Sequence, residues 1–134
     1  MIKIDLDDDR YFFEHANLKQ KDTGEPFDVW FDEMGKLRNV QHNEPRFKFK
    51  SNGIELDIIL HSDDTLEVVN PIRDIKKFKH LKKAKEFIRK FEKPLRMHWN
   101  QDLTSLELMY IIRSVCKNNE ELLDVLSRVA SGDF

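Results

Sequence analysis

Glycine, proline and cysteine are scarce in this sequence of 134 residues. The four glycines are isolated from one another, whereas loops that cradle phosphate groups with backbone N–H groups need several glycines close together. A P-loop and a dinucleotide-binding loop are therefore excluded. The single cysteine, Cys116, excludes an internal disulfide framework.

Long apolar runs are also missing. No run approaches the ~20 apolar residues that a membrane-spanning helix needs, so we expect no membrane partner. The N-terminal segment turns acidic at Asp5, which argues against a secretory signal peptide. Together with the lone cysteine, these features favour a soluble, cytoplasmic protein.

Catalytic motifs are absent as well. There is no G-x-S-x-G sequence, and no two histidines stand at the i, i+2 or i, i+4 spacing that zinc sites commonly use. Cys116 falls on the apolar side of a predicted helix, where we expect a buried structural thiol. We therefore expect no enzyme, no cofactor and no metal site. A small enzyme is an alternative that needs His42, His98 and acidic side chains to converge in one cleft.

The residues that are present describe a single domain, 1–134. Hydrophobic residues make up 40% of the chain and charged residues 36%, which is too apolar for a disordered chain. Residues 1–72 are rich in strand patterns, and residues 73–134 are helical. The predicted fold class is α+β, with a mostly antiparallel sheet followed by an amphipathic basic helix and two C-terminal helices.

Strands are predicted at 27–31, 46–50, 54–60 and 65–69 from alternating apolar residues and flanking turn residues. Asn52 and Gly53 are the strongest hairpin signal, because both tolerate a positive φ. A further strand at 37–40 is predicted to return beside 27–31. The N-terminal part is read as a strand at 2–6, a short helix at 8–18 and a polar loop at 19–26.

Helical periodicity begins at residue 74 and continues to residue 92. Pro94 ends this helix or begins the next turn. Thr104 and Glu107 form a capping box for a helix that runs to about Cys116, and a last helix ends before Gly132. The predicted core takes residues from both halves: Phe27, Val29, Phe31, Phe47, Phe49, Ile58, Leu60, Leu81, Ile88, Phe91, Trp99, Leu108, Ile112, Leu122 and Leu126.

Positive charge is concentrated in residues 73–93. This segment holds ten Lys or Arg residues and three acids, about +7 in a chain whose net charge is −2. Residues 1–72 carry about −7, with sixteen acids and nine bases. A molecule with such opposed faces can form a homo-oligomer, or can bind an acidic partner through one side.

The predicted partner-binding residues lie on the outer side of the basic helix. One interpretation is a surface that follows the phosphates of a nucleic acid. Against it, the inferred pI is near 6.2 and no aromatic ring lies on that side to stack on bases. The other interpretations are a protein-contacting face, or a solvated face on which Glu86 pairs with neighbouring lysines. The candidate residues are Lys79, Lys82, Lys83, Arg89, Lys90 and Lys93.

Both tryptophans have two interpretations. Trp30 points to the opposite side of its strand from Val29 and Phe31, so it is predicted to be exposed and is a candidate anchor for a partner. Trp99 follows a predicted helix end, where it either closes the junction between sheet and helices or binds a ligand.

Three segments, 23–31, 42–48 and 83–100, resemble small uncharacterised bacterial proteins of a domain-of-unknown-function group. Members carry a His-x-Pro-Pro-His-x-His segment before a hairpin, then an amphipathic helix and a Trp-Asn pair. Here His42 and Pro45 match that segment, while Arg46 and Lys48 replace the other two histidines. The resemblance implies a hairpin packed by helices, and a mobile-element or toxin–antitoxin context.

These observations favour a non-catalytic module that binds or regulates another macromolecule, as an inhibitor or an antitoxin does. Its partner is expected to be another protein. The alternative is a nucleic-acid-binding protein that uses the basic helix 73–93.

Overall fold

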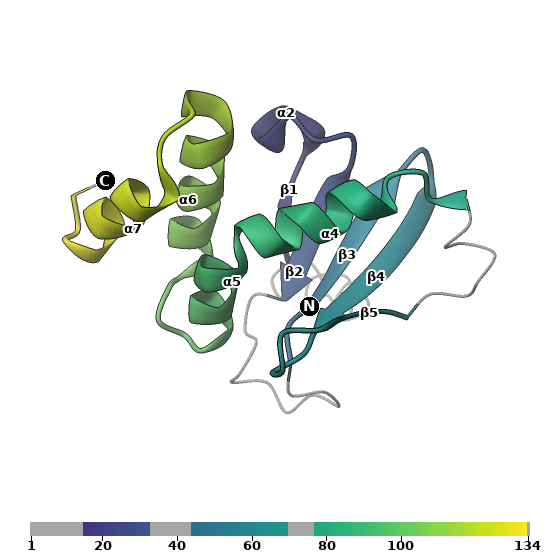
Figure 1. The fold of residues 1–134 in the computed structure, drawn as a ribbon. Coiled ribbons are helices and arrows are strands. Elements are labelled where there is room, and N and C mark those ends of the chain that lie inside the picture. Colours follow the sequence, from purple (N-terminus) through teal and green to yellow (C-terminus); the bar gives the residue numbers. More distant parts are fainter. Residues whose placement is uncertain (1–14, 33–43, 70–76, 134) are drawn as a thin grey trace, which may run out of the picture.

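The computed structural model describes residues 15–32, 44–69 and 77–133. Five strands form one antiparallel sheet in the order of the sequence, and α4 lies across one of its faces (Figure 1). Helices α5, α6 and α7 follow beside the sheet. This arrangement confirms the predicted α+β class. The strands are β1 (His15–Leu18), β2 (Asp28–Asp32), β3 (Arg46–Ser51), β4 (Ile54–Leu60) and β5 (Leu66–Val68). The helices are α2 (Gln20–Thr23), α4 (Leu81–Lys90), α5 (Glu92–Trp99), α6 (Ser105–Asn118) and α7 (Leu122–Ala130).

Alternation decides which sheet face is buried. Phe47 and Phe49 of β3 stand opposite Ile58 and Leu56 of β4, and all four are buried. The residues between them point to the other face. Asn52 and Gly53 join the two strands with φ angles of 52° and 79°, so the predicted hairpin is confirmed.

Aromatic rings join α4 to the sheet. Phe87 contacts Phe27 and Phe49 edge-on, with ring centroids 6.1 and 6.3 Å apart, and Phe91 lies 5.1 Å from Phe87. Ala84 and Ile88 are buried on the same side of the helix. The apolar side of α4 therefore faces the sheet, as its periodicity predicts.

The capping box is also confirmed. The Thr104 hydroxyl accepts a hydrogen bond from the Glu107 N–H at 3.1 Å, and the Glu107 carboxylate accepts one from the Thr104 N–H at 2.8 Å. The helix runs two residues beyond Cys116 to Asn118 and ends at Asn119, whose φ is 54°. Gly132 follows the last helix with a φ of 75°.

Several predicted boundaries are wrong. Residues 15–18 form strand β1 rather than the end of a helix, because they pair with β2. The loop predicted at 19–26 contains the short helix α2. The helix predicted at 74–92 is shorter in the described residues, where α4 begins only at Leu81 and stops at Lys90, and α5 begins at Glu92. Pro94 occupies the third position of α5, where its missing N–H has no helical partner to lose.

Most of the predicted core is confirmed, with two exceptions. Leu81 and Leu122 are only partly buried, because each begins a helix at the edge of the packed region. The strands predicted at 2–6 and 37–40 lie outside the described residues. The neighbours of β2 are β1 and β3. Buried apolar residues that the sequence did not single out include Leu18, Leu56, Phe78, Leu95, Leu103 and Val125.

Replacing Phe49 with Ala should lower the free energy of unfolding by about 3–5 kcal/mol, because the ring is fully buried between β2 and α4. Urea unfolding followed by circular dichroism measures this change. The exposed neighbour Lys50→Ala is the control and should change stability by less than about 0.5 kcal/mol. A loss below about 1 kcal/mol for Phe49→Ala would contradict the packing described.

Candidate functional site

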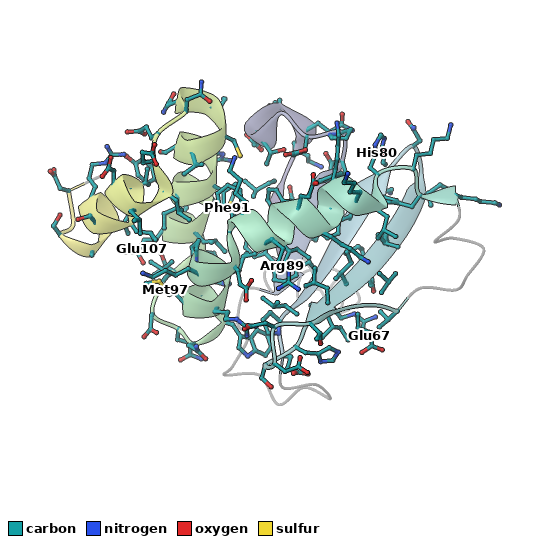
Figure 2. All side chains as sticks on the ribbon, viewed as in Figure 1. Glu67, His80, Arg89, Phe91, Met97 and Glu107 are labelled. Atoms are coloured by element: carbon teal, nitrogen blue, oxygen red, sulfur yellow. The ribbon has the colours of Figure 1, made fainter. Side chains whose placement is uncertain are left out.

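The basic residues predicted to bind a partner are all exposed in the structure. Four of them, Lys82, Lys83, Arg89 and Lys90, lie on α4 away from its buried side. Lys79 precedes this helix, and Lys93 lies in the first turn of α5. Figure 2 labels His80, which precedes the first residue of α4, and Arg89 near the other end of the helix. The row thus runs along the outer surface of the domain.

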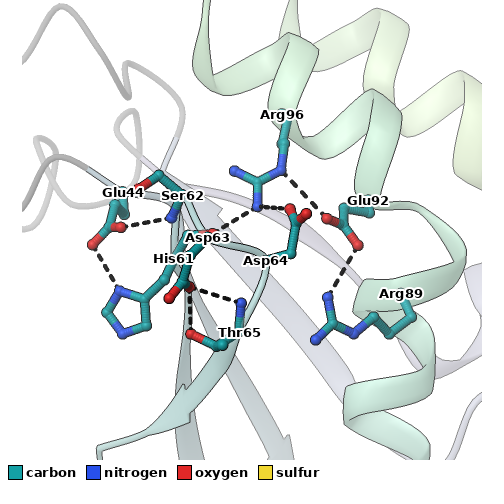
Figure 3. Close-up of polar contacts among 9 residues, drawn as sticks. All are labelled: Glu44, His61, Ser62, Asp63, Asp64, Thr65, Arg89, Glu92 and Arg96. Carbon is teal, nitrogen blue, oxygen red and sulfur yellow. Dashed lines mark hydrogen bonds and ion pairs between the residues drawn. The ribbon is translucent and has the colours of Figure 1, made fainter.

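Near the C-terminal end of the row, Arg89 is neutralised by an acid of the chain itself. Arg89 lies 3.1 Å from one oxygen of Glu92, and Arg96 lies 3.5 Å from the other (Figure 3). Arg96 also reaches the Asp64 carboxylate at 2.8 Å and donates to the carbonyl oxygen of His61 at 2.7 Å. These contacts fasten α5 to the turn between β4 and β5. Arg89 and Arg96 therefore have a structural role.

The N-terminal end of the row is different. Within residues 77–133 and the other described segments, no carboxylate pairs with Lys79, Lys82 or Lys83. Glu86 does not pair with them either, so the helical ion pairs expected of a solvated face are not formed in this part of the structure. Lys90 lies with its ammonium group 5.5 Å from the centroid of the Phe91 ring. The N-terminal end of α4 thus carries charge that no acid of the described residues compensates.

Helix polarity strengthens this charge. The backbone dipole makes the N-terminus of a helix positive, so acids are favoured there and lysines are not. The first turn of α4 has no acidic residue, and it contains Lys82 and Lys83. Its N-cap, His80, makes no side-chain capping hydrogen bond. Two sources of positive potential therefore coincide.

A pocket of about 290 Å³ opens beside this end of α4. It lies between the β3–β4 hairpin and the residues that lead into the helix. Its lining combines hydroxyl, amide and ammonium groups with one aliphatic side chain. The lining residues are Ser51, Asn52, Ile54, Lys77, Lys79 and His80.

A second pocket, of about 560 Å³, lies at the other end of the row. Met97 and Leu122 give it an apolar part, while Lys90 and Lys93 are cations on its wall. The remaining wall belongs largely to the paired residues Arg89, Glu92, Arg96 and Asp64, with Asn100. In this second pocket, apolar side chains therefore lie next to cations of the basic row.

Trp30 does not belong to this surface. It pairs with Lys48 and Asn17 on neighbouring strands, on the sheet face opposite the one that α4 covers. Its ring is partly buried, and the Lys19 ammonium group lies 5.5 Å from the ring centroid. The predicted direction of the side chain is confirmed, whereas the predicted exposure is only partial. A partner that used Trp30 would bind on the other side of the molecule from the lysines.

Trp99 is a core residue. Its side chain is only 9% exposed. Trp99 is the last residue of α5, whereas the sequence predicted that it follows the end of a helix. The sequence pattern missed α5 because its eight residues include a proline and only a short apolar stretch.

His98 is the histidine whose surroundings come nearest to a catalytic pair. Its Nε2 lies 2.9 Å from the Ser105 hydroxyl, and its ring packs edge-on against Phe31. Burial lowers the pKa of His98 to about 4, so the ring is a weak base at neutral pH. No carboxylate among the described residues orients its other nitrogen. His42, the partner considered above, lies outside those residues.

His98 should make stability depend on pH. Its pKa is about 4 in the fold against 6.5 when exposed, so the unfolded chain binds the proton more readily. Stability should therefore fall as the pH drops from 6.5 to 4, by about 3 kcal/mol from this residue. Urea unfolding of the wild type and of His98→Gln across this range isolates the effect. A stability difference that stays constant with pH would contradict it.

His61 is held between two carboxylates. Its Nδ1 lies 2.8 Å from Glu44 and its Nε2 2.6 Å from Glu67, and these hydrogen bonds raise its pKa. Glu44 also accepts the Ser62 N–H at 2.7 Å, and these contacts lower the pKa of its carboxyl group. The nearby Asp63 accepts two hydrogen bonds from Thr65 and shapes the turn. The polar groups here build the β4–β5 turn rather than an oxygen-lined ion site.

The His61–Glu44 pair should stabilise the fold most between about pH 4.5 and 6.5. Protonated His61 contributes fully below its ordinary pKa of 6.5, and the contribution is lost as pH rises through the higher folded value. The Glu44 contribution is lost as pH falls below its ordinary 4.5. The difference in melting temperature between the wild type and His61→Gln should therefore shrink from pH 6 to pH 9. An equal difference at all pH values would count against this arrangement.

Cys116 is half-buried, and burial raises the pKa of its thiol. A thiol with a raised pKa is a poor nucleophile, so this residue packs against the core. In the described ranges, no three His, Cys, Asp or Glu side chains are grouped so that they could hold a metal ion. No helix in those ranges has the length and apolar character needed to cross a bilayer.

Comparison of the chain with protein-family models, with curated proteins and with solved structures finds no match. The resemblance of segments 23–31, 42–48 and 83–100 to a domain-of-unknown-function group stays a prediction. The site therefore has to be interpreted from its own geometry.

Proposed function

We propose that this chain is a non-catalytic module that binds an acidic partner protein through the N-terminal half of α4. One observation carries the proposal: Lys79, Lys82 and Lys83 are exposed without an acidic partner in the described structure, while Arg89 and Arg96 farther along are neutralised. A purely solvated helix gains from interspersed acids in its first turn, and this one has none.

Two features favour a protein over a nucleic acid. Glu86 stands in the middle of the lysine row, where a run of phosphates would meet a like charge. The row also leads to the larger pocket, whose Met97 and Leu122 offer apolar surface beside Lys90 and Lys93. Protein interfaces combine an apolar centre with a charged rim, and methionine is enriched in them.

The role we infer is regulatory, of the inhibitor or antitoxin kind that the resemblance above implies, with a mobile genetic element as its setting. A non-catalytic role is supported by the histidines of the described ranges. His61 builds a turn, and His98 is buried as a weak base.

Reversing Lys82 and Lys83 to Glu should weaken partner capture by about tenfold or more at low salt, because opposite charges steer and hold the encounter. Affinity capture from the source cells, with the bound protein quantified at a series of salt concentrations, measures this. The matched control reverses Lys21 and Lys117, which are exposed on α2 and α6 and change the net charge equally. Equal capture by both double variants would contradict the proposal.

Gel-shift experiments with single- and double-stranded DNA and RNA test the alternative. The proposal expects no shift at physiological salt. A shift that disappears in the Lys82→Glu, Lys83→Glu variant, and not in the control, would assign the surface to nucleic acid instead.

A further inference from the structure

The smaller pocket and the start of α4 form a site of their own at the end of the lysine row. We infer that this site binds a phosphoryl group, carried on a phosphorylated side chain of the acidic partner. The inference rests on the proposed function, because Lys79 lines this pocket and Lys82 and Lys83 follow it in the first turn of α4. It adds the chemical identity of the group that those lysines hold.

Ser51 is the observation that separates this site from an ordinary helix end. It is the last residue of β3 and only 9% exposed, on the same sheet face as Phe47 and Phe49. It lines the pocket, and no hydrogen bond in the described structure occupies its hydroxyl. The Ser51 hydroxyl is therefore free to donate a hydrogen bond to a group bound in the pocket.

The helix supplies further donors. Backbone N–H groups in the first turn of a helix have no partner within the helix and point out of its end. In α4 these belong to Leu81, Lys82 and Lys83, and neither an acidic side chain nor the N-cap residue His80 satisfies them. A helix N-terminus in this state is a favourable place for an anion.

Cations surround the same point. Lys77 and Lys79 line the pocket directly, and no ion pair of the described residues engages either ammonium group. Asn52 of the hairpin turn adds an amide group to the lining. All of these groups can donate hydrogen bonds. Among the described residues of the lining there is no Asp or Glu side chain.

The number of donors favours a phosphoryl group over a carboxylate. A carboxylate offers two oxygens and one negative charge, whereas a phosphoryl group on a side chain offers three strong acceptor oxygens and a charge of about −1.5 to −2. A hydroxyl, several N–H groups and two ammonium groups can satisfy three oxygens together. A single carboxylate of the partner would leave part of the set unused.

The test is a titration followed by NMR, at constant ionic strength maintained with chloride. The probes are inorganic phosphate and three forms of one acidic peptide, with phosphoserine, serine or glutamate at its centre. We expect saturable shifts of the backbone amides of Ser51, Asn52 and Leu81 with phosphate and with the phosphoserine peptide. The serine peptide should bind at least tenfold more weakly than the phosphoserine peptide.

Ser51→Ala should weaken binding of the phosphoserine peptide by about fivefold or more, since a charge-assisted hydrogen bond is lost. Ser127→Ala, an exposed serine on α7, is the matched control and should bind like the wild type. Equal binding by Ser51→Ala and the wild type would overturn the inference. So would equal binding of the serine and phosphoserine peptides, or shifts with phosphate that never saturate.

A 5′-phosphorylated oligonucleotide is the last probe. If it binds in a way that depends on Ser51 while the phosphoserine peptide does not, the site belongs to a nucleic acid end and the inference is wrong. The proposed function is tested separately. Loss of partner capture on reversing Lys82 and Lys83, together with full capture and unchanged peptide binding by Ser51→Ala, would retain the acidic partner and reject the phosphoryl group.

Discussion

The packing of Phe87 against Phe27 and Phe49 is the contact on which the rest of the structure depends. It joins α4 to β3 and to the residue that precedes β2, through rings that are at most 3% exposed. The side chains of a helix project at fixed angles around its axis. When Phe87 faces the sheet, Lys82, Lys83 and Lys90 must therefore face away from it. Strand β3, which carries Phe49, ends at Ser51. The packing of Phe87 against Phe49 therefore also holds the β3–β4 hairpin beside the start of α4, where the two line one pocket.

The two ends of α4 use positive charge in opposite ways. Arg89 and Lys90 lie in the last turn, where the helix dipole favours cations, and Arg89 also has Glu92 as a partner. Lys82 and Lys83 lie in the first turn, where the dipole opposes them by about 0.3–1 kcal/mol for a typical exposed charge. Acidic residues in the first turn of α4 would make the helix more stable. The arrangement is consistent with a helix start adapted to an external anion, and with a helix end adapted to the fold.

The features that follow local rules could be predicted from the sequence. Alternation located β3 and β4, the Asn52–Gly53 pair located their turn, and the Thr104 capping box located α6. Strand β1 could not be found in this way, because its four residues are held by pairing with β2 rather than by their own pattern. Arg96 and Asp64 are separated by 32 residues, so no spacing in the sequence could show that they neutralise each other. Ser51 could be placed on the inner face, but its pocket depends on where α4 begins.

The charges of the sheet bear on self-association through opposed faces. On the sheet face away from α4, Arg46 lies 2.8 Å from Asp57, and Lys48 lies 3.6 Å from Glu55. Charges that are already paired across neighbouring strands have less to offer a second copy of the chain. Some acids of residues 1–72 are thus already paired with bases of the described sheet. The lysines at the start of α4 have no acidic partner among the described residues. Among the described residues, the lysines at the start of α4 are thus better placed to bind an acidic group of a different molecule, as we propose, than to bind a second copy of the sheet.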